Sequence, residues 1–148
     1  MLPIPAAFIE NFNLLLRRIS AAGAEQVIVL LGVPVARSGT TLFMAGINFS
    51  IVDACSGFSA LYASVTLALV LAYMNRSWRR GVITLAAAFP IAMACNVLRC
   101  AFLALIVQRW GAGILHTFLH PASGVLTFTA TAVLLIFLSG VEIREPAA

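Results

Sequence analysis

Three residues of this sequence, Cys55, Arg99 and His120, carry side chains that together could do chemistry. A thiolate is a strong nucleophile, and a neighbouring base or cation lowers the pKa of a thiol. A histidine can accept the thiol proton and later donate a proton to a leaving amine. An arginine in a water-poor site can stabilise the oxyanion of a tetrahedral intermediate. The three residue types are therefore those that cysteine-dependent acyl transfer needs.

Each of the three also has an ordinary explanation when it is taken alone. A single buried cysteine behaves as a small hydrophobic residue. Arg99 stands near the end of an apolar run, from which a long side chain can extend to the lipid headgroups. His120 precedes Pro121, a residue type that favours the first turn of a helix. The chemical hypothesis therefore depends on whether the fold brings the three residues together.

The composition identifies the environment of the chain. Of its 148 residues 62% are hydrophobic and 9% are charged, whereas soluble domains carry about a quarter charged residues. The sequence therefore predicts an integral membrane protein, organised as one domain over residues 1–148. The net charge is +4, from nine basic and five acidic residues, and every basic residue is an arginine. The arginines are dispersed or stand at the ends of apolar runs. This distribution does not indicate nucleic-acid binding, and it is better used to orient the chain in the membrane.

The hydrophobic pattern predicts an all-α membrane protein. An N-terminal amphipathic helix is indicated by Phe8, Phe12, Leu15 and Ile19 at helical spacing, with Arg17 and Arg18 ending it. About twenty apolar residues suffice to cross a bilayer. Four later stretches meet this length approximately and predict about four transmembrane helices: Ile19 to Val35, Ser56 to Met74, Gly81 to Val107, and Pro121 to Leu138.

The segment from Ala36 to Val52 has a different periodicity. Its side chains alternate along Thr41 to Val52, and Gly39 and Gly46 provide turn residues. This pattern favours a short hairpin of strands, directly before the cysteine. Because an open sheet edge is not stable in lipid, the hairpin is expected outside the hydrocarbon.

The distribution of arginines indicates the orientation of the chain in the membrane, and the rise per residue of a helix indicates the depth of each side chain. The stretch Asn75 to Arg80 contains three arginines and Trp78, so it is expected in the cytoplasm, with Arg17 and Arg18 on the same side. Cys55 and the hairpin then lie on the extracytoplasmic face of the cytoplasmic membrane. Arg99 follows Val82 by seventeen residues, or about 25 Å, which places it near the outer boundary of the bilayer. His120 opens its helix from that side, so the three residues are predicted at one depth.

Three short motifs around these residues resemble one protein family. Asp53-Ala54-Cys55-Ser56-Gly57 is similar to the Glu-Ala-Cys-Ser-Gly motif of the exosortase/archaeosortase family, and Asn96-Val97-Leu98-Arg99 matches its Asn-x-x-Arg motif. The segment from His120 through Gly124 to Phe128 matches its His-x-x-x-Gly-x-x-x-Phe motif. The resemblance runs from about Ala22 to Leu138, and three motifs in order on alternating spans make it specific. The chain resembles a short form of the family that keeps the catalytic core.

The resemblance implies a membrane cysteine protease or transpeptidase without a cofactor or metal. Cys55 would be the nucleophile, Arg99 the oxyanion stabiliser and His120 the acid and base. The substrate would be an exported protein whose C-terminal sorting signal consists of a short motif, an apolar helix and a basic cluster, and membrane lipids are the other expected partner. Asp53 replaces the usual glutamate, and its role is open between orienting Arg37 and orienting Arg99. The expected supporting residues are Asp53, Ser56, Gly57, Asn96, Gly124 and Arg37.

Two other interpretations compete with the enzyme. The first is a non-catalytic accessory subunit of exopolysaccharide or protein export, in which Arg99 binds a lipid headgroup. The second is a metal site built from thiols and imidazoles. The second is disfavoured because Cys95 lies about 6 Å deeper than Arg99 by helix rise. The candidate ligands of that site are Cys55, Cys95, Cys100, His116 and His120.

Overall fold

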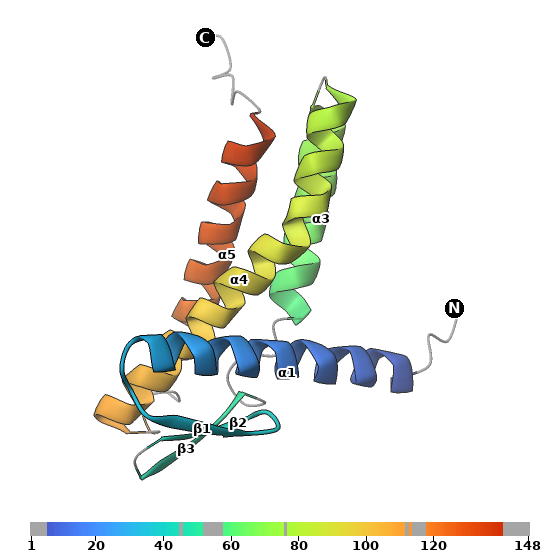
Figure 1. Cartoon of the computed structure of the whole chain (residues 1–148). Helices are drawn as coiled ribbons and strands as arrows, with labels where there is room; N and C mark the ends of the chain where they lie inside the picture. Colours follow the sequence, from blue (N-terminus) through green and yellow to red (C-terminus); the bar gives the residue numbers. More distant parts are fainter. Residues whose placement is uncertain are drawn as a thin grey trace.

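The computed structural model describes residues 6–44, 46–51, 58–75, 77–111, 113 and 118–140. Helix α1 (Ala6–Leu30) and a small sheet lie at one end of the molecule, and helices α3 (Phe58–Met74) and α5 (Leu119–Ser139) extend away from them (Figure 1). Helix α4 (Trp78–Trp110) runs from the other end to α1 and the sheet, against which its C-terminal part packs. The predicted helical architecture with strands before the cysteine motif is therefore confirmed.

Helix α1 is continuous through Arg17 and Arg18, so the predicted break at these two residues is wrong. Arginine is a good helix former, and the helix ends only before Gly32, whose φ of 80° is easily reached by glycine. Figure 1 shows α1 lying across the end of the bundle, at a large angle to α3 and α5. Its charged residues, which include Glu25 as well as both arginines, make it poorly suited to the hydrocarbon.

The strand region forms a three-stranded antiparallel sheet in the order β1-β2-β3. Its strands are β1 (Val35–Ser38), β2 (Thr41–Met44) and β3 (Ile47–Ser50), with Val35 opposite Met44 and Met44 opposite Ile47. One face is apolar and packs in a core with α1 and α4, to which the sheet contributes Leu42, Met44 and Phe49. The sequence predicted a simple hairpin with alternation along Thr41 to Val52, which covers β2 and β3, and the additional strand is β1 (Val35–Ser38).

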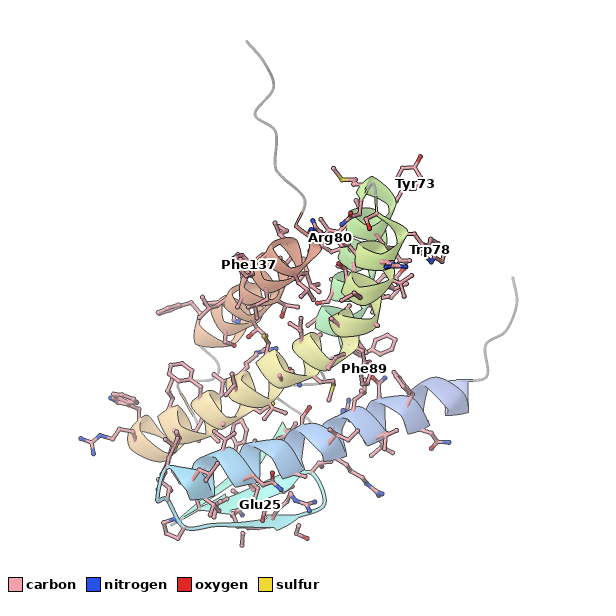
Figure 2. The ribbon with its side chains drawn as sticks, turned by 45° about the horizontal axis from the view of Figure 1, so that its top comes forward. Glu25, Tyr73, Trp78, Arg80, Phe89 and Phe137 are labelled. Carbon is pink, nitrogen blue, oxygen red and sulfur yellow. The ribbon has the colours of Figure 1, made fainter. Side chains whose placement is uncertain are left out.

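Helices α3, α4 and α5 pack around a core of small and aliphatic side chains formed by Ala68, Leu71, Ala88 and Leu135. At the far end from the sheet, Asn75 Nδ2 donates a hydrogen bond of 2.7 Å to the carbonyl oxygen of Ser139. A Cβ atom placed on Gly81 would lie 3.1 Å from the carbonyl oxygen of Ala72, so glycine permits the close approach of α4 to α3 there. These contacts close the end of the bundle that carries Arg80 (Figure 2).

The predicted count of four spans is not confirmed. Among the described residues, Trp78–Trp110 and Pro121–Ser139 are long and apolar enough to cross a membrane, and Phe58–Met74 is a shorter apolar helix. Of the region predicted as the first span, Ile19 to Val35, residues 19–30 belong to α1 and Val35 begins β1. Helix α4 has 33 residues, or about 50 Å, which exceeds a hydrocarbon core of about 30 Å. It contains Pro90 and runs obliquely to α5 in Figure 1.

The position of α1 also corrects the expected side of Arg17 and Arg18. The ring centroids of Phe12 and Phe58 are 6.4 Å apart, so this part of α1 lies at the beginning of α3. Figure 2 shows Tyr73, Trp78 and Arg80 gathered at the other end of the α3–α4 pair. The two arginines of α1 therefore lie at the opposite end from Arg80, because no crossing separates them from the start of α3.

The contact between α1 and α4 requires a glycine. A Cβ atom on Gly23 would lie 2.8 Å from Val97 Cγ2 and 2.9 Å from Val97 Cγ1. Valine is branched at Cβ and has few rotamers, so it cannot move aside easily. The absence of a side chain at Gly23 therefore sets the distance between the two helices.

We expect Gly23→Ala to lower the stability of the protein by about 1–3 kcal/mol, because the added methyl group overpacks a rigid contact. This loss should exceed the small gain in helix propensity. The measurement is the midpoint of thermal unfolding in detergent for Gly23→Ala, Val97→Ala and the double variant. The double variant should be more stable than the sum of the single effects predicts, and strictly additive effects would contradict this close contact.

Candidate active site

The cysteine motif lies outside the described residues. This applies to Asp53, Cys55, Ser56 and Gly57, and also to His116. Phe58, the next residue after this motif, is the first residue of α3. The geometry of the site is therefore built from α4, α5 and α1.

Arg99 contacts the beginning of α5. Its Nε donates a hydrogen bond of 3.1 Å to Ser123 Oγ. A Cβ atom on Gly124 would lie 3.7 Å from Arg99 Nη2, so the guanidinium packs directly against the backbone there. His120 lies in the first turn of α5, and its side chain lies outside the described residues. Because residues three and four apart share a helix face, Arg99 is held one turn from the backbone of His120.

Gly124 explains how the arginine fits between the helices. The guanidinium packs against the backbone of Gly124, and a methyl group there would still fit, in ordinary van der Waals contact at 3.7 Å from Nη2. A branched or longer side chain would extend into the guanidinium. The third motif therefore places His120 in the first turn of α5 and, one turn later, the backbone of Gly124 against which Arg99 packs.

Asn96 and Arg99 belong to the same motif but have different neighbours. Asn96 is 2% exposed, and its Nδ2 donates a hydrogen bond of 2.9 Å to Ser20 Oγ on α1. This bond fixes the rotation of α4 against α1, and the same rotation turns Arg99 toward α5. The Oδ1 atom of Asn96 is buried without a hydrogen-bond partner in the described part of the chain. Asn96 thus joins α4 to α1.

Arg37 is engaged away from α5. Its Nε forms an ion pair of 2.8 Å with Glu25 Oε2, and its Nη1 donates a hydrogen bond of 3.2 Å to the carbonyl oxygen of Gly39. Both charged side chains are about one third exposed, so the pair is worth about 0–1 kcal/mol. Its role is to attach β1 and its turn to α1. The sequence had suggested no partner for Glu25.

A cleft of about 550 Å³ lies beside Arg99, between α4 and α5. It is lined mainly by apolar side chains, with Arg99 and Ser123 as a polar pair in its wall. Cys95, one turn before Arg99 on α4, also lines it. The lining residues are Cys95, Leu98, Arg99, Phe102, Leu103, Ala122, Ser123, Leu126, Thr127 and Ala130.

The two other cysteines lie in different surroundings. Cys95 lines the cleft, whereas Cys100 is fully buried in the core that α4 forms with α1 and the sheet. They therefore face different sides of α4 and cannot ligate one ion together. In the described part of the chain no group of three or more histidine, cysteine, aspartate or glutamate side chains could hold a metal.

The described part of the chain has two helices long and apolar enough to cross a membrane, a small sheet at one end, and Arg99 held at the start of α5. This arrangement fits a helical membrane protein with a polar site at one end of its bundle. The family comparison makes this class specific. A family model described as transmembrane exosortase (Exosortase_EpsH) matches residues 1–137. The chain belongs to this family, which confirms the family indicated by the motifs. No curated protein sequence and no solved structure is significantly similar to the chain.

Proposed function

We propose that this exosortase-family membrane protein is a cysteine protease or transpeptidase that cleaves C-terminal sorting signals of exported proteins. Cys55 is the nucleophile, His120 the acid and base, and Arg99 the oxyanion stabiliser. The observation that carries the proposal is the hydrogen bond from Arg99 Nε to Ser123 Oγ, which holds the guanidinium one turn from His120. The family match over residues 1–137 supports the reaction class.

The reaction balances with the groups of the chain and the substrate. His120 takes the proton of the Cys55 thiol, the resulting thiolate attacks the scissile carbonyl carbon, and the negative charge on the carbonyl oxygen is stabilised by Arg99. The C–N bond breaks as His120 protonates the leaving amine, and a thioester on Cys55 remains. Water or an acceptor amine then attacks the thioester, which gives an acid or a new amide and restores the thiol.

The proposed location is the cytoplasmic membrane, with the sheet end of the molecule on the extracytoplasmic face. The polar site and the sheet lie at the same end of the bundle, where an exported substrate would reach them. Trp78, Arg79 and Arg80 at the other end fit a cytoplasmic interface.

One observation favours a second candidate, the accessory subunit. Arg99 borders an apolar cleft, and a lipid could place its headgroup phosphate on the guanidinium and its acyl chain in the cleft. In that case the fold would need no reactive thiol. The reactivity of Cys55 therefore separates the two candidates.

We expect Cys55 to react with iodoacetamide at neutral pH at least about tenfold faster than Cys95 or Cys100, since a nucleophilic cysteine is kept as the thiolate. The measurement is alkylation of each thiol in the purified protein, followed by peptide mass spectrometry. Arg99→Ala should slow the alkylation of Cys55, and Arg109→Ala, which removes a cation at the end of α4, is the matched control. A Cys55 that reacts no faster than the other two thiols would favour the accessory subunit.

A further inference from the structure

We propose that the cleft between α4 and α5 is the binding groove for the apolar helix that follows the scissile bond of the substrate. The inference rests on the proposed function, and it assigns a place to a part of the substrate that the catalytic residues do not contact. One face of the substrate helix would lie along α5, with its first turn at Arg99 and Ser123.

The walls of the cleft suit a membrane helix. Leu98 and Phe102 on α4 are each 58% exposed, and Leu126 on α5 is 69% exposed, so a row of apolar side chains is available for packing. The hydroxyl of Thr127 donates a hydrogen bond of 2.7 Å to the carbonyl oxygen of Ser123, within α5. Apart from the polar pair of Arg99 and Ser123 the cleft therefore offers a mainly apolar surface.

The cleft is also continuous with the proposed site of reaction. Because α4 and α5 are antiparallel here, the part of the wall from Arg99 and Ser123 to Cys95, Thr127 and Ala130 leads away from the turn that contains His120. Phe102 and Leu103 line the cleft on the other side of Arg99. A substrate whose scissile carbonyl oxygen lies at Arg99 must continue in this direction to enter the bilayer. From Ser123 to Ser139, α5 extends sixteen residues, or about 24 Å, so it can accompany most of a membrane-spanning helix.

The small side chains of the wall favour a helix over an acyl chain. Membrane helices associate through small residues, which let their backbones approach closely. Ala122 and Ala130 lie on the cleft face of α5, two helical turns apart, with Leu126 between them. The volume of about 550 Å³ is too small for a whole helix, but it accommodates the row of side chains along one helical face.

The native thiol of Cys95 allows a direct test that does not depend on catalysis. In the Cys55→Ala/Cys100→Ala variant, Cys95 is the one remaining cysteine of the chain's three. This variant is reconstituted in vesicles with synthetic leucine–alanine transmembrane peptides, each of which carries one activated cysteine at a different position. The amount of peptide–Cys95 disulfide is measured for each position.

We expect cross-linking to peak at peptide positions three or four residues apart, because one face of the peptide helix enters the groove. Ala130→Trp should fill the groove and lower the peak yields by about fivefold or more, since it blocks a small-residue packing contact. Val125→Trp is the matched control: Val125 is 67% exposed, does not line the cleft, and its substitution should leave the yields unchanged.

Cross-linking without helical period, or yields that Ala130→Trp does not change, would overturn the groove. A second outcome would also overturn it. If the peptide does not change the rate at which a lipid-soluble maleimide alkylates Cys95, and this rate depends on the chain length of the lipids, the cleft is occupied by lipid. Because the variant lacks Cys55, these outcomes are separate from a failure of the proposed chemistry, which the reactivity of Cys55 reports.

Discussion

Cys55→Ala is expected to abolish the shortening of a co-expressed substrate. The substitution removes the thiol that we propose forms the thioester, and loss of the nucleophile from an unrelated protease costs about 10⁶ in kcat. The residual rate should therefore be undetectable. The substrate is an exported protein with a short C-terminal motif, an apolar helix and a basic cluster. The measurement is the ratio of full-length to shortened substrate on a gel of whole cells.

Cys100→Ala is the matched control for this experiment. Cys100 is also a thiol of the chain, but it is buried between α4, α1 and the sheet. Its substitution removes a buried sulfur and leaves the proposed site intact, so processing should continue. Shortened substrate in the Cys55→Ala cells would contradict a role for Cys55 as nucleophile.

Arg99→Ala is expected to lower the rate of substrate processing by about 10²–10³, the usual cost of losing a group that stabilises an oxyanion. Arg99→Lys should recover little of this loss. Lysine keeps a positive charge but lacks the planar guanidinium, whose Nε binds Ser123 Oγ and whose Nη2 lies beside Gly124. The measurement is the initial rate of processing by purified protein in proteoliposomes.

Two variants separate catalysis from simple packing in this experiment. Ser123→Ala removes one partner of Arg99 and keeps the cation, so it should cost about tenfold or less. Arg109→Lys changes a cation in the last turn of α4 and should not change the rate of processing. A loss in Ser123→Ala as large as that in Arg99→Ala would show that the arginine acts by joining α4 to α5, and not on the oxyanion.

The sequence predicted the family, the helices α3 to α5 and the strand region, because each has a strong local signal. Apolar runs, turn glycines and three ordered motifs do not depend on distant contacts. The sequence also predicted that Arg99 and His120 lie at the same depth in the membrane. Arg99 contacts Ser123, which is one turn after His120 on α5, and this contact agrees with the prediction for these two residues.

The course of α1 could not be predicted in the same way. The stretch from Ile19 to Val35 is apolar enough to suggest a span, but its orientation is decided by tertiary contacts. Gly23 allows α1 to pack closely on Val97, and Ser20 accepts a hydrogen bond from Asn96. These contacts lie along α4, and they keep α1 across the end of the bundle. The ion pair of Arg37 with Glu25 depends on that position and has no local signal either.

The central claim is that Cys55 forms a covalent intermediate with the substrate, and trapping that intermediate tests it most directly. Purified protein in proteoliposomes is mixed with substrate, quenched in acid within the first turnover, digested and analysed by mass spectrometry. The account predicts a peptide in which Cys55 carries the N-terminal part of the substrate through a bond that hydroxylamine releases, as a thioester requires. Processing by the wild-type protein without such an adduct, together with continued processing by a variant that lacks all three cysteines, would contradict it.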